Sequence, residues 1–217
     1  MRLLIVRHGE TVDNVEHRIS GRSDCSLTEN GHRQATRLAD RLATEHLDAI
    51  VTSPLARAGE TATAVATHHA LTVRVDADLT EVGMGDWQNR RLADIDADDP
   101  DAVARWRHHP AQNPPPGGEP LAELAERAER ALRRHHTEFS DATVLWSTHG
   151  ALIGVFLCRV LGMDINRRKQ LLSDNASISE LDVYDDVAVL RRFNDTDHVR
   201  ELLGDGLAAF HLAGGRT

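Results

Sequence analysis

The sequence predicts an α/β fold: a three-layer α/β/α sandwich in which helices cover both faces of a mainly parallel central sheet. Two observations support this prediction. Short apolar runs typical of strands alternate with amphipathic helical patterns over most of the chain. The 217 residues, of which 41% are apolar and 27% charged, also suit a folded chain with a sizeable core and exclude a disordered or fibrous protein.

In the N-terminal half, apolar runs at residues 3–6, 47–52 and 71–75 predict three strands. The first run is continuous and ends in a polar loop, which is typical of a buried parallel strand. A helical pattern follows Thr28, whose hydroxyl suits an N-cap. Ser53 followed by Pro54 predicts a second N-cap with proline in the first turn, for a helix over 55–69.

In the C-terminal half, residues 79–110 predict irregular structure with short helical pieces, and the proline- and glycine-rich stretch 113–120 predicts a loop. Apolar spacing then predicts a helix from about 119 to 139, a fourth strand at 143–146 and a helix at 152–161. Residues 177–183 and 187–193 alternate apolar and polar side chains around two aspartates, which predicts a hairpin.

The composition narrows the expected partners and location. The formal net charge is −9, whereas proteins that bind nucleic acid or acidic membranes non-specifically are normally basic, so we expect neither partner. Cys25 and Cys158 are isolated, which argues against a disulfide framework or a zinc ribbon and favours a reducing cytoplasm. The longest apolar run, residues 151–163, is too short to span a bilayer, which takes about 20 residues.

The chain contains 13 histidines, including adjacent pairs at 68–69, 108–109 and 135–136. These pairs resemble metal sites at first sight. Adjacent residues on a helix point about 100° apart, however, so no pair forms an obvious chelate. We therefore expect solvent-exposed or core-edge positions for them, and no metal site.

Charged and polar residues follow the predicted strands at their carboxyl ends, where an open parallel sheet binds its ligand. These residues are Arg7 and His8 after the first strand, Arg57 beyond the second, Glu81 after the third and His149 after the fourth. Arginine's planar fork suits phosphate oxygens, and a histidine kept neutral can act as a nucleophile. Together they predict a site for a tetrahedral dianion, with one carboxylate beside it as a proton donor.

Several segments resemble motifs of the histidine phosphatase superfamily, also called phosphoglycerate mutase-like, and they occur in the family's order. They are Arg7-His8-Gly9-Glu10-Thr11 with Asn14, the stretch Ser20 to Gly31, Ser53 to Ala58, Gly117-Gly118-Glu119 and Thr148-His149-Gly150. Glu81 with Gly83 to Trp87 resembles a segment of the phosphatase branch. The chain departs from that segment at Gln88-Asn89, where the branch usually has Glu-Gly, which leaves substrate details open.

The resemblance implies one phosphoglycerate mutase-like domain over 1–217, with a variable, cap-like insertion at about 82–120. It implies a metal-independent phosphomonoesterase, without a cofactor, that hydrolyses a small phosphorylated metabolite through a phosphohistidine on His8. In this scheme Glu81 protonates the leaving oxygen and then takes a proton from the attacking water. The implied site residues are His8, Glu81, Arg7, Arg57 and His149 as catalytic, and Arg7, Asn14, Ser20, Gly21, Arg57, His149 and Gly150 as substrate-binding.

Some alternatives stay open at this level. Glu10, Glu60 and Asp86 compete with Glu81 as the acid, and Asn14 also suits a turn or cap. The main alternative function is a 2,3-bisphosphoglycerate-dependent phosphoglycerate mutase. It is disfavoured because the stretch after Glu81 has no basic residue before Arg90-Arg91. A phosphohistidine phosphatase or an inactive scaffold fits less well. The hairpin over 177–193 offers an edge strand for a possible homodimer.

Overall fold

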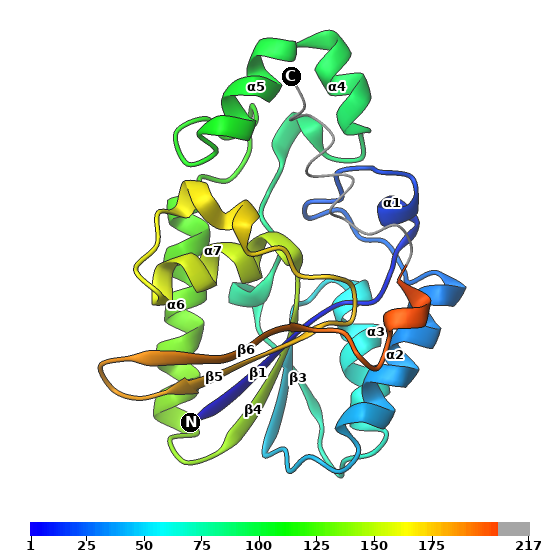
Figure 1. Cartoon of the computed structure of the whole chain (residues 1–217), viewed down its shortest axis with the longest axis vertical. Coiled ribbons are helices and arrows are strands. Elements are labelled where there is room, and N and C mark those ends of the chain that lie inside the picture. The colour runs from blue at the N-terminus through cyan, green and yellow to red at the C-terminus, as the bar shows by residue number, and fades with distance from the viewer. Residues whose placement is uncertain (204–217) are drawn as a thin grey trace.

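The computed structural model describes residues 1–203 as a six-stranded sheet with helices on both faces (Figure 1). The strand order is β3-β2-β4-β1-β5-β6. Neighbours from β3 to β1 pair in parallel, whereas β5 runs antiparallel to both β1 and β6. The strands are β1 (Arg2–Arg7), β2 (Ala49–Thr52), β3 (Val73–Val75), β4 (Thr143–Thr148), β5 (Ile178–Val183) and β6 (Ala188–Asp195). The predicted sandwich and the predicted hairpin, β5–β6, are confirmed.

The helices form the two outer layers and a group at one end of the molecule. The α-helices are α1 (Val12–Val15), α2 (Glu29–Leu42), α3 (Ala56–Ala66), α4 (Leu92–Asp98), α5 (Pro100–His108), α6 (Leu121–Glu138) and α7 (Gly150–Val160). Short 3₁₀ helices are η1 (Ala77–Leu79), η2 (Gly85–Trp87), η3 (Ile165–Gln170) and η4 (Arg200–Leu202). α2 and α3 lie on one side of the sheet and α6 and α7 on the other, while α4 and α5 lie at the top of Figure 1.

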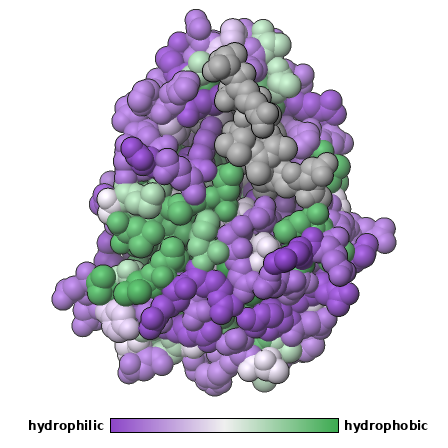
Figure 2. All heavy atoms as spheres, in the orientation of Figure 1, coloured by the Kyte–Doolittle hydropathy of each residue, from purple (hydrophilic) through white to green (hydrophobic). Residues whose placement is uncertain are grey.

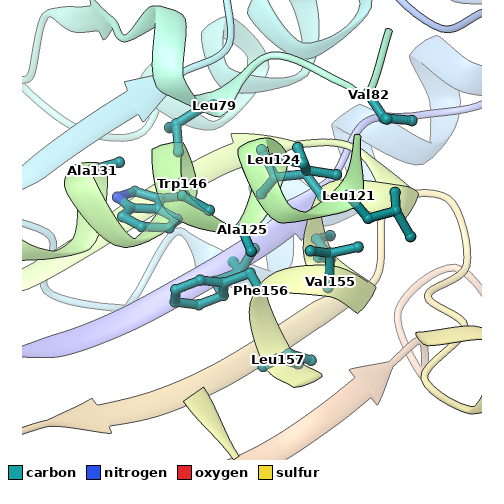
Figure 3. Packing of buried hydrophobic residues seen from close by; sticks show 14 of the residues in the cluster. Leu79, Val82, Leu121, Leu124, Ala125, Ala131, Trp146, Val155, Phe156 and Leu157 are labelled. Carbon is teal, nitrogen blue, oxygen red and sulfur yellow. The ribbon is translucent and has the colours of Figure 1, made fainter. Parts of the chain in front are cut away.

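Two apolar cores hold these layers together, because successive side chains of a strand point to opposite faces of the sheet. In β1, Leu4 and Val6 pack toward α2 and α3, whereas Leu3 and Ile5 belong to the core beneath α6 and α7. Figure 3 shows this second core, in which Trp146 of β4 lies beside Phe156 of α7, with ring centroids 5.4 Å apart. The sheet is therefore covered on both faces at the point where its central strands end.

The register of the two central strands places their final residues side by side. β1 and β4 pair in parallel from Arg2 opposite Thr143 to Arg7 opposite Thr148. Both strands end at the same edge of the sheet, so His8 and His149 begin neighbouring loops. Parallel pairing thus brings together two segments that are about 140 residues apart in the sequence.

The stretch at 82–120 contains η2, α4 and α5, and its two ends meet in a close backbone approach. Gly85 has φ +51°, and a Cβ there would lie 2.1 Å from the carbonyl oxygen of Pro116, so only glycine fits. Trp87 and Trp106 pack edge to face with centroids 5.5 Å apart. The proposal that this stretch is a variable cap on a single domain stays a prediction, and residues 204–217 lie outside the described part of the chain.

Three local predictions need correction. The helix predicted over 55–69 is α3, Ala56–Ala66, and its N-cap is Leu55 without a side-chain hydrogen bond, so Ser53 is not the N-cap. The strand predicted at 71–75 is shorter, Val73–Val75. His135 lies not at the edge of the core but inside it, 3% exposed, where it accepts a hydrogen bond from Trp146.

Candidate active site

His8 and His149 form the centre of a buried polar cluster at the carboxyl ends of β1 and β4. The backbone N–H of His8 donates to the carbonyl of Thr148 at 3.0 Å, which extends the pairing of the two strands by one residue. The centroids of the two imidazole rings are 5.2 Å apart, and the residues are 4% and 0% exposed. The sheet itself therefore sets the distance between the two rings.

The His8 imidazole is held in one orientation from both ring nitrogens. Nδ1 lies 2.7 Å from its neighbour's carbonyl, Gly9 O, and the guanidinium Nε of Arg57 donates to Nε2 at 3.2 Å. A carbonyl only accepts and a guanidinium only donates, so Nδ1 carries the proton and Nε2 presents its lone pair. Burial, together with the positive charges of Arg57 and Arg7, holds the pKa of His8 well below its ordinary value.

Arg57 comes from the first turn of α3 and is itself anchored to a loop. Its Nη2 donates to Gly21 O at 2.8 Å and its Nη1 to Ser23 O at 2.9 Å. These carbonyls belong to the loop before α2, and Gly21 has φ +52°, a conformation that favours glycine. The guanidinium is thus fixed with its Nε–H directed at His8.

Arg7 is buried yet incompletely paired. Its Nη1 donates to the carbonyl of Ser173 at 2.6 Å, whereas its Nε is buried without a partner. Burial lowers the pKa of Arg7 to about 10, and the Glu81 carboxylate opposes that shift. A buried donor without an acceptor is costly, about 1–3 kcal/mol, which suggests that a ligand completes this site.

His149 shows the same pattern of one satisfied and one unsatisfied nitrogen. Its Nε2 lies 2.7 Å from Ser53 Oγ, and its Nδ1 is buried without a partner. The backbone N–H of Leu55 donates to the same Oγ at 3.3 Å. A hydroxyl carries one donor and two lone pairs, so this contact is compatible with either tautomer of His149. Burial, and the charges of Arg57 and Arg7, keep the pKa of His149 well below its ordinary value.

Glu81 lies at the N-terminus of α7 and accepts backbone hydrogen bonds on both carboxylate oxygens. Oε2 accepts from Ala151 N at 3.0 Å, and Oε1 accepts from Leu152 N at 3.1 Å and Val82 N at 2.8 Å. A helix N-terminus favours a negative charge in this position. The carbonyl of Glu81 is also held, because it accepts from Arg127 at 3.0 Å.

These groups surround a cleft of about 880 Å³, a volume that includes its open mouth. Glu81 is the single carboxylate among the described residues that line it, so the geometry favours Glu81 over Glu10, Glu60 and Asp86. Glu10 instead accepts hydrogen bonds from Thr28 and Asn30 at the start of α2. Of the residues named from the sequence, Arg7, His8, Asn14, Ser20, Gly21, Arg57, Glu81 and Gly150 line the cleft. His149 does not line it, and its ring lies against that of His8.

Asn14 and Gly150 illustrate how the cleft wall is built. Asn14 completes a capping box with Thr11 at the start of α1, and its Oδ1 also accepts from Asn175 at 3.2 Å. It therefore has a cap role and a place in the cleft. A Cβ on Gly150 would lie 3.4 Å from Arg7 Nε, so glycine at this position allows the guanidinium to pack closely against the start of α7.

Three further residues belong to the site but were not identified from the sequence. Ser53 was interpreted as a helix cap, whereas it orients His149. Asn175, just before β5, donates to His8 O at 3.0 Å. Arg168 of η3 lines the cleft and is 8% exposed. The sequence signal for Arg168 is absent because Arg167, Arg168 and Lys169 are consecutive, and only the fold shows which one faces inward.

Residues 1–203 are the part of the chain that the structure describes. No group of three or more His, Cys, Asp or Glu side chains is arranged to hold a metal ion in this part of the chain. None of the helices described for it combines the length and the apolar character needed to cross a membrane.

Comparisons with known proteins find relatives that are similar in sequence and in fold. Residues 3–196 match the family model described as histidine phosphatase superfamily (branch 1). Phosphoserine phosphatase 1 of Hydrogenobacter thermophilus is 31% identical over 201 residues, covering 93% of this chain and 95% of that protein. A probable phosphoglycerate mutase, GpmB of Klebsiella pneumoniae, is 33% identical over 84% of this chain and 85% of its own. A mycobacterial glucosyl-3-phosphoglycerate phosphatase superposes with a TM-score of 0.82 at 32% identity, covering 89% and 98% of the two chains.

Proposed function

The chain belongs to the histidine phosphatase superfamily, and we propose that it hydrolyses small phosphorylated metabolites through a phosphohistidine on His8. Its relatives support a phosphoric monoester hydrolase. The observation that carries the residue assignment is the arrangement of buried polar atoms at the carboxyl ends of β1 and β4. His8 Nε2 carries a lone pair that the Nε–H of Arg57 contacts, and Arg7 Nε and His149 Nδ1 are buried without a partner.

The first half of the reaction transfers the phosphoryl group to His8. The Nε–H of Arg57 turns from His8 Nε2 to a phosphoryl oxygen, and the freed Nε2 lone pair forms the P–N bond while the P–O bond of the ester breaks. Arg7, Arg57 and His149 donate hydrogen bonds to the phosphoryl oxygens, as phosphoryl transfer requires charge to be held on those oxygens. Glu81 gives a proton to the departing oxygen, so that an alcohol leaves. The Nδ1–H bond to Gly9 O stabilises the charge that the ring acquires.

The second half returns the enzyme to its starting state. Glu81 takes a proton from a water molecule, whose oxygen attacks phosphorus as the P–N bond breaks. Inorganic phosphate leaves, and the electron pair returns to His8 Nε2. Asn14, Ser20, Gly21 and Gly150 line the space around the phosphoryl group and bind substrate. Two guanidiniums supply the positive charge, so we propose that no metal is needed.

The direct test is hydrolysis of p-nitrophenyl phosphate by purified protein in the presence of EDTA, followed by trapping of the phosphoenzyme. We expect turnover in EDTA and an alkali-stable, acid-labile phosphoenzyme that His8→Ala removes. His46→Ala is the matched control, because His46 is exposed and lies between α2 and β2. Loss of turnover in EDTA, or a label that persists in His8→Ala, contradicts the proposal.

The mutase alternative is less supported, although one relative named above is a probable mutase. A mutase returns the phosphoryl group to a second hydroxyl, whereas a phosphatase gives it to water. Phosphorus NMR of 3-phosphoglycerate with a trace of 2,3-bisphosphoglycerate separates the two functions. We expect inorganic phosphate as the product; accumulation of 2-phosphoglycerate instead favours the mutase.

The homodimer and the cytoplasmic location stay predictions. β6 is an edge strand. Val187, just before β6, is 56% exposed, and Val189, within it, is 40% exposed. Apolar residues gather on the face in view where α7 and the hairpin lie, whereas α4 and α5 present a mainly polar surface (Figure 2). Light scattering of the purified protein tests whether a second copy covers this edge.

A further inference from the structure

Arg168 is a buried cation whose guanidinium forms no hydrogen bond or ion pair within residues 1–203. It belongs to η3, which packs against α7, and the residue is 8% exposed. Its Nε is buried without a partner, and no hydrogen bond or ion pair of its guanidinium occurs with any residue in 1–203. Burial lowers the pKa of Arg168, because removing the guanidinium from water disfavours its charged form.

The other arginines of the cleft differ from Arg168 in this respect. Arg18 forms an ion pair with Glu16 at 2.7 Å, and Arg57 donates to two backbone carbonyls. Arg7 donates to one carbonyl, and its Nε is buried without a partner. Arg168 alone among the four has no protein acceptor. The guanidinium of Arg168 is therefore available to a partner that enters the cleft.

The surroundings of Arg168 fix its position without neutralising it. Its Cζ lies 5.8 Å from the centroid of the Trp106 ring, and Lys169 Nζ lies 4.4 Å from the same centroid. A guanidinium near an aromatic ring is attracted by the ring but keeps its full charge. Leu171 and Leu172 follow Arg168 along the same wall. Apolar walls strengthen any ion pair that forms between them.

The single carboxylate of the cleft does not serve as the partner. Both Glu81 oxygens accept backbone hydrogen bonds at the start of α7, and no contact joins Glu81 to Arg168. The charge of Glu81 nevertheless acts on both Arg7 and Arg168, which places Glu81 near both cations. The cleft thus offers the Arg7 guanidinium beside the proposed phosphoryl site and the Arg168 guanidinium on the wall formed by η3.

We propose that Arg168 binds a second anionic group, a carboxylate or a phosphate, on the alcohol part of the phosphomonoester. This inference rests on the proposed function and specifies its substrate class: small phosphomonoesters with two anionic ends. The guanidinium fork accepts either group in a bidentate arrangement. Esters of neutral alcohols leave Arg168 unpaired and are poorer substrates.

Matched substrate pairs test the inference in the whole protein. The carboxylate pairs are 3-phosphoglycerate with glycerol 3-phosphate, and phosphoserine with phosphoethanolamine. The phosphate pair is fructose 1,6-bisphosphate with fructose 6-phosphate. For at least one pair we expect kcat/KM to be roughly 10-fold to 100-fold higher for the more anionic member, as a charge-assisted hydrogen bond provides. Which pair responds identifies the group.

Arg168→Gln is expected to remove this preference, by lowering kcat/KM for the more anionic member far more than for its partner. Arg167→Gln is the matched control, since Arg167 is the adjacent, exposed arginine and does not line the cleft. Ligand-free Arg168→Gln should also unfold at or above the wild-type temperature, because it loses an unpaired buried charge.

The inference is overturned if the wild type shows no preference in any pair, or if Arg168→Gln slows both members of the preferred pair equally. A failure of the proposed function looks different, because p-nitrophenyl phosphate is then not turned over by any of these proteins.

Discussion

Two clusters of charged and polar groups lie on the same sheet, and they differ in how completely the hydrogen bonds of their buried atoms are satisfied. The catalytic cluster consists of Arg7, His8, Arg57 and His149 at the carboxyl ends of β1 and β4. Two of its buried polar atoms have no partner. The second, which we call the structural cluster, consists of Asp76, Arg134, His135 and Trp146 between the end of β3, α6 and β4.

In the structural cluster each polar side chain has a partner. Trp146 Nε1 donates to His135 Nδ1 at 2.9 Å, and His135 Nε2 lies 3.1 Å from Asp76 Oδ2. Asp76 also accepts from Arg134 at 2.5 Å and from the backbone of Asp78 at 2.9 Å. Burial alone would raise the pKa of Asp76, but these hydrogen bonds outweigh it and hold the pKa well below its usual value.

The difference indicates that burial of a histidine or an arginine does not by itself mark function. Both clusters bury an imidazole and position it with neighbouring charges. Only the catalytic cluster retains donors that the protein leaves unpaired, and such groups cost stability unless a ligand completes them. We therefore expect substitutions in the catalytic cluster to affect mainly activity, and substitutions in the structural cluster to affect mainly the free energy of unfolding.

The largest expected effect is that of His8→Asn on catalysis. The nucleophile is lost, so we expect kcat/KM for p-nitrophenyl phosphate to fall by roughly 10⁴-fold or more. The free energy of unfolding at pH 7 should stay near the wild-type value. Urea titration and steady-state kinetics measure the two quantities. Activity within tenfold of wild type would remove His8 from the proposed mechanism.

Glu81→Gln should give the next largest effect, and its size should depend on the leaving group. Loss of general acid catalysis typically costs about 10²-fold to 10⁴-fold. An alkyl phosphate needs the proton at its departing oxygen, whereas p-nitrophenolate is already a good leaving group. We expect kcat/KM to fall much further for glycerol 3-phosphate than for p-nitrophenyl phosphate. An equal fall for both substrates contradicts the assignment of Glu81 as the acid.

His135→Leu tests the opposite side of the comparison. The substitution leaves Trp146 Nε1 and Asp76 without their buried partner, so we expect a loss of roughly 2–4 kcal/mol in the free energy of unfolding. Activity of the folded fraction should stay within about twofold, because His135 does not line the cleft. A stable protein with lost activity would mean that the two clusters are coupled.

The sequence predicted the layers of the fold and the convergence of the strand ends more completely than the details of the site. Apolar runs and helical spacing identify elements, and parallel strands necessarily bring Arg7, His8 and His149 to one edge. Ser53 was misassigned because Ser-Pro before a helix is a typical N-cap pattern, whereas the backbone instead directs its hydroxyl to His149. That choice depends on a residue 96 positions away.

Residues that act through burial were the hardest to predict. Arg168 and His135 each lie in a run of similar residues, Arg167-Arg168-Lys169 and His135-His136. The local sequence does not distinguish their inward and outward members, because only the packing of η3 against α7 and of α6 against β4 decides which one is buried. The same packing decides that the buried polar atoms of the structural cluster have partners and that two of those in the catalytic cluster do not.

The smallest expected effect is a difference in the pH dependence of stability between the two clusters. An unfolded histidine takes up a proton near pH 6.5, whereas burial and the nearby arginines keep His8 neutral in the folded state. The unfolded state thus binds more protons below that pH, so the free energy of unfolding falls as the pH decreases from 7 to 5.5. For one histidine this loss is about 1.2 kcal/mol, and His8→Asn should remove it.

The structural cluster should respond in a lower pH range. The Asp76 carboxylate is stabilised in the folded state, so its contribution is present above its unfolded pKa and is lost as the pH falls below about 4. Urea titrations of wild type, His8→Asn and Asp76→Asn from pH 7 to pH 3.5 separate the two ranges. If His8→Asn and wild type lose stability in parallel between pH 7 and 5.5, His8 is not held neutral in the folded state. The catalytic cluster then makes no contribution from His8 to the loss of stability in this pH range.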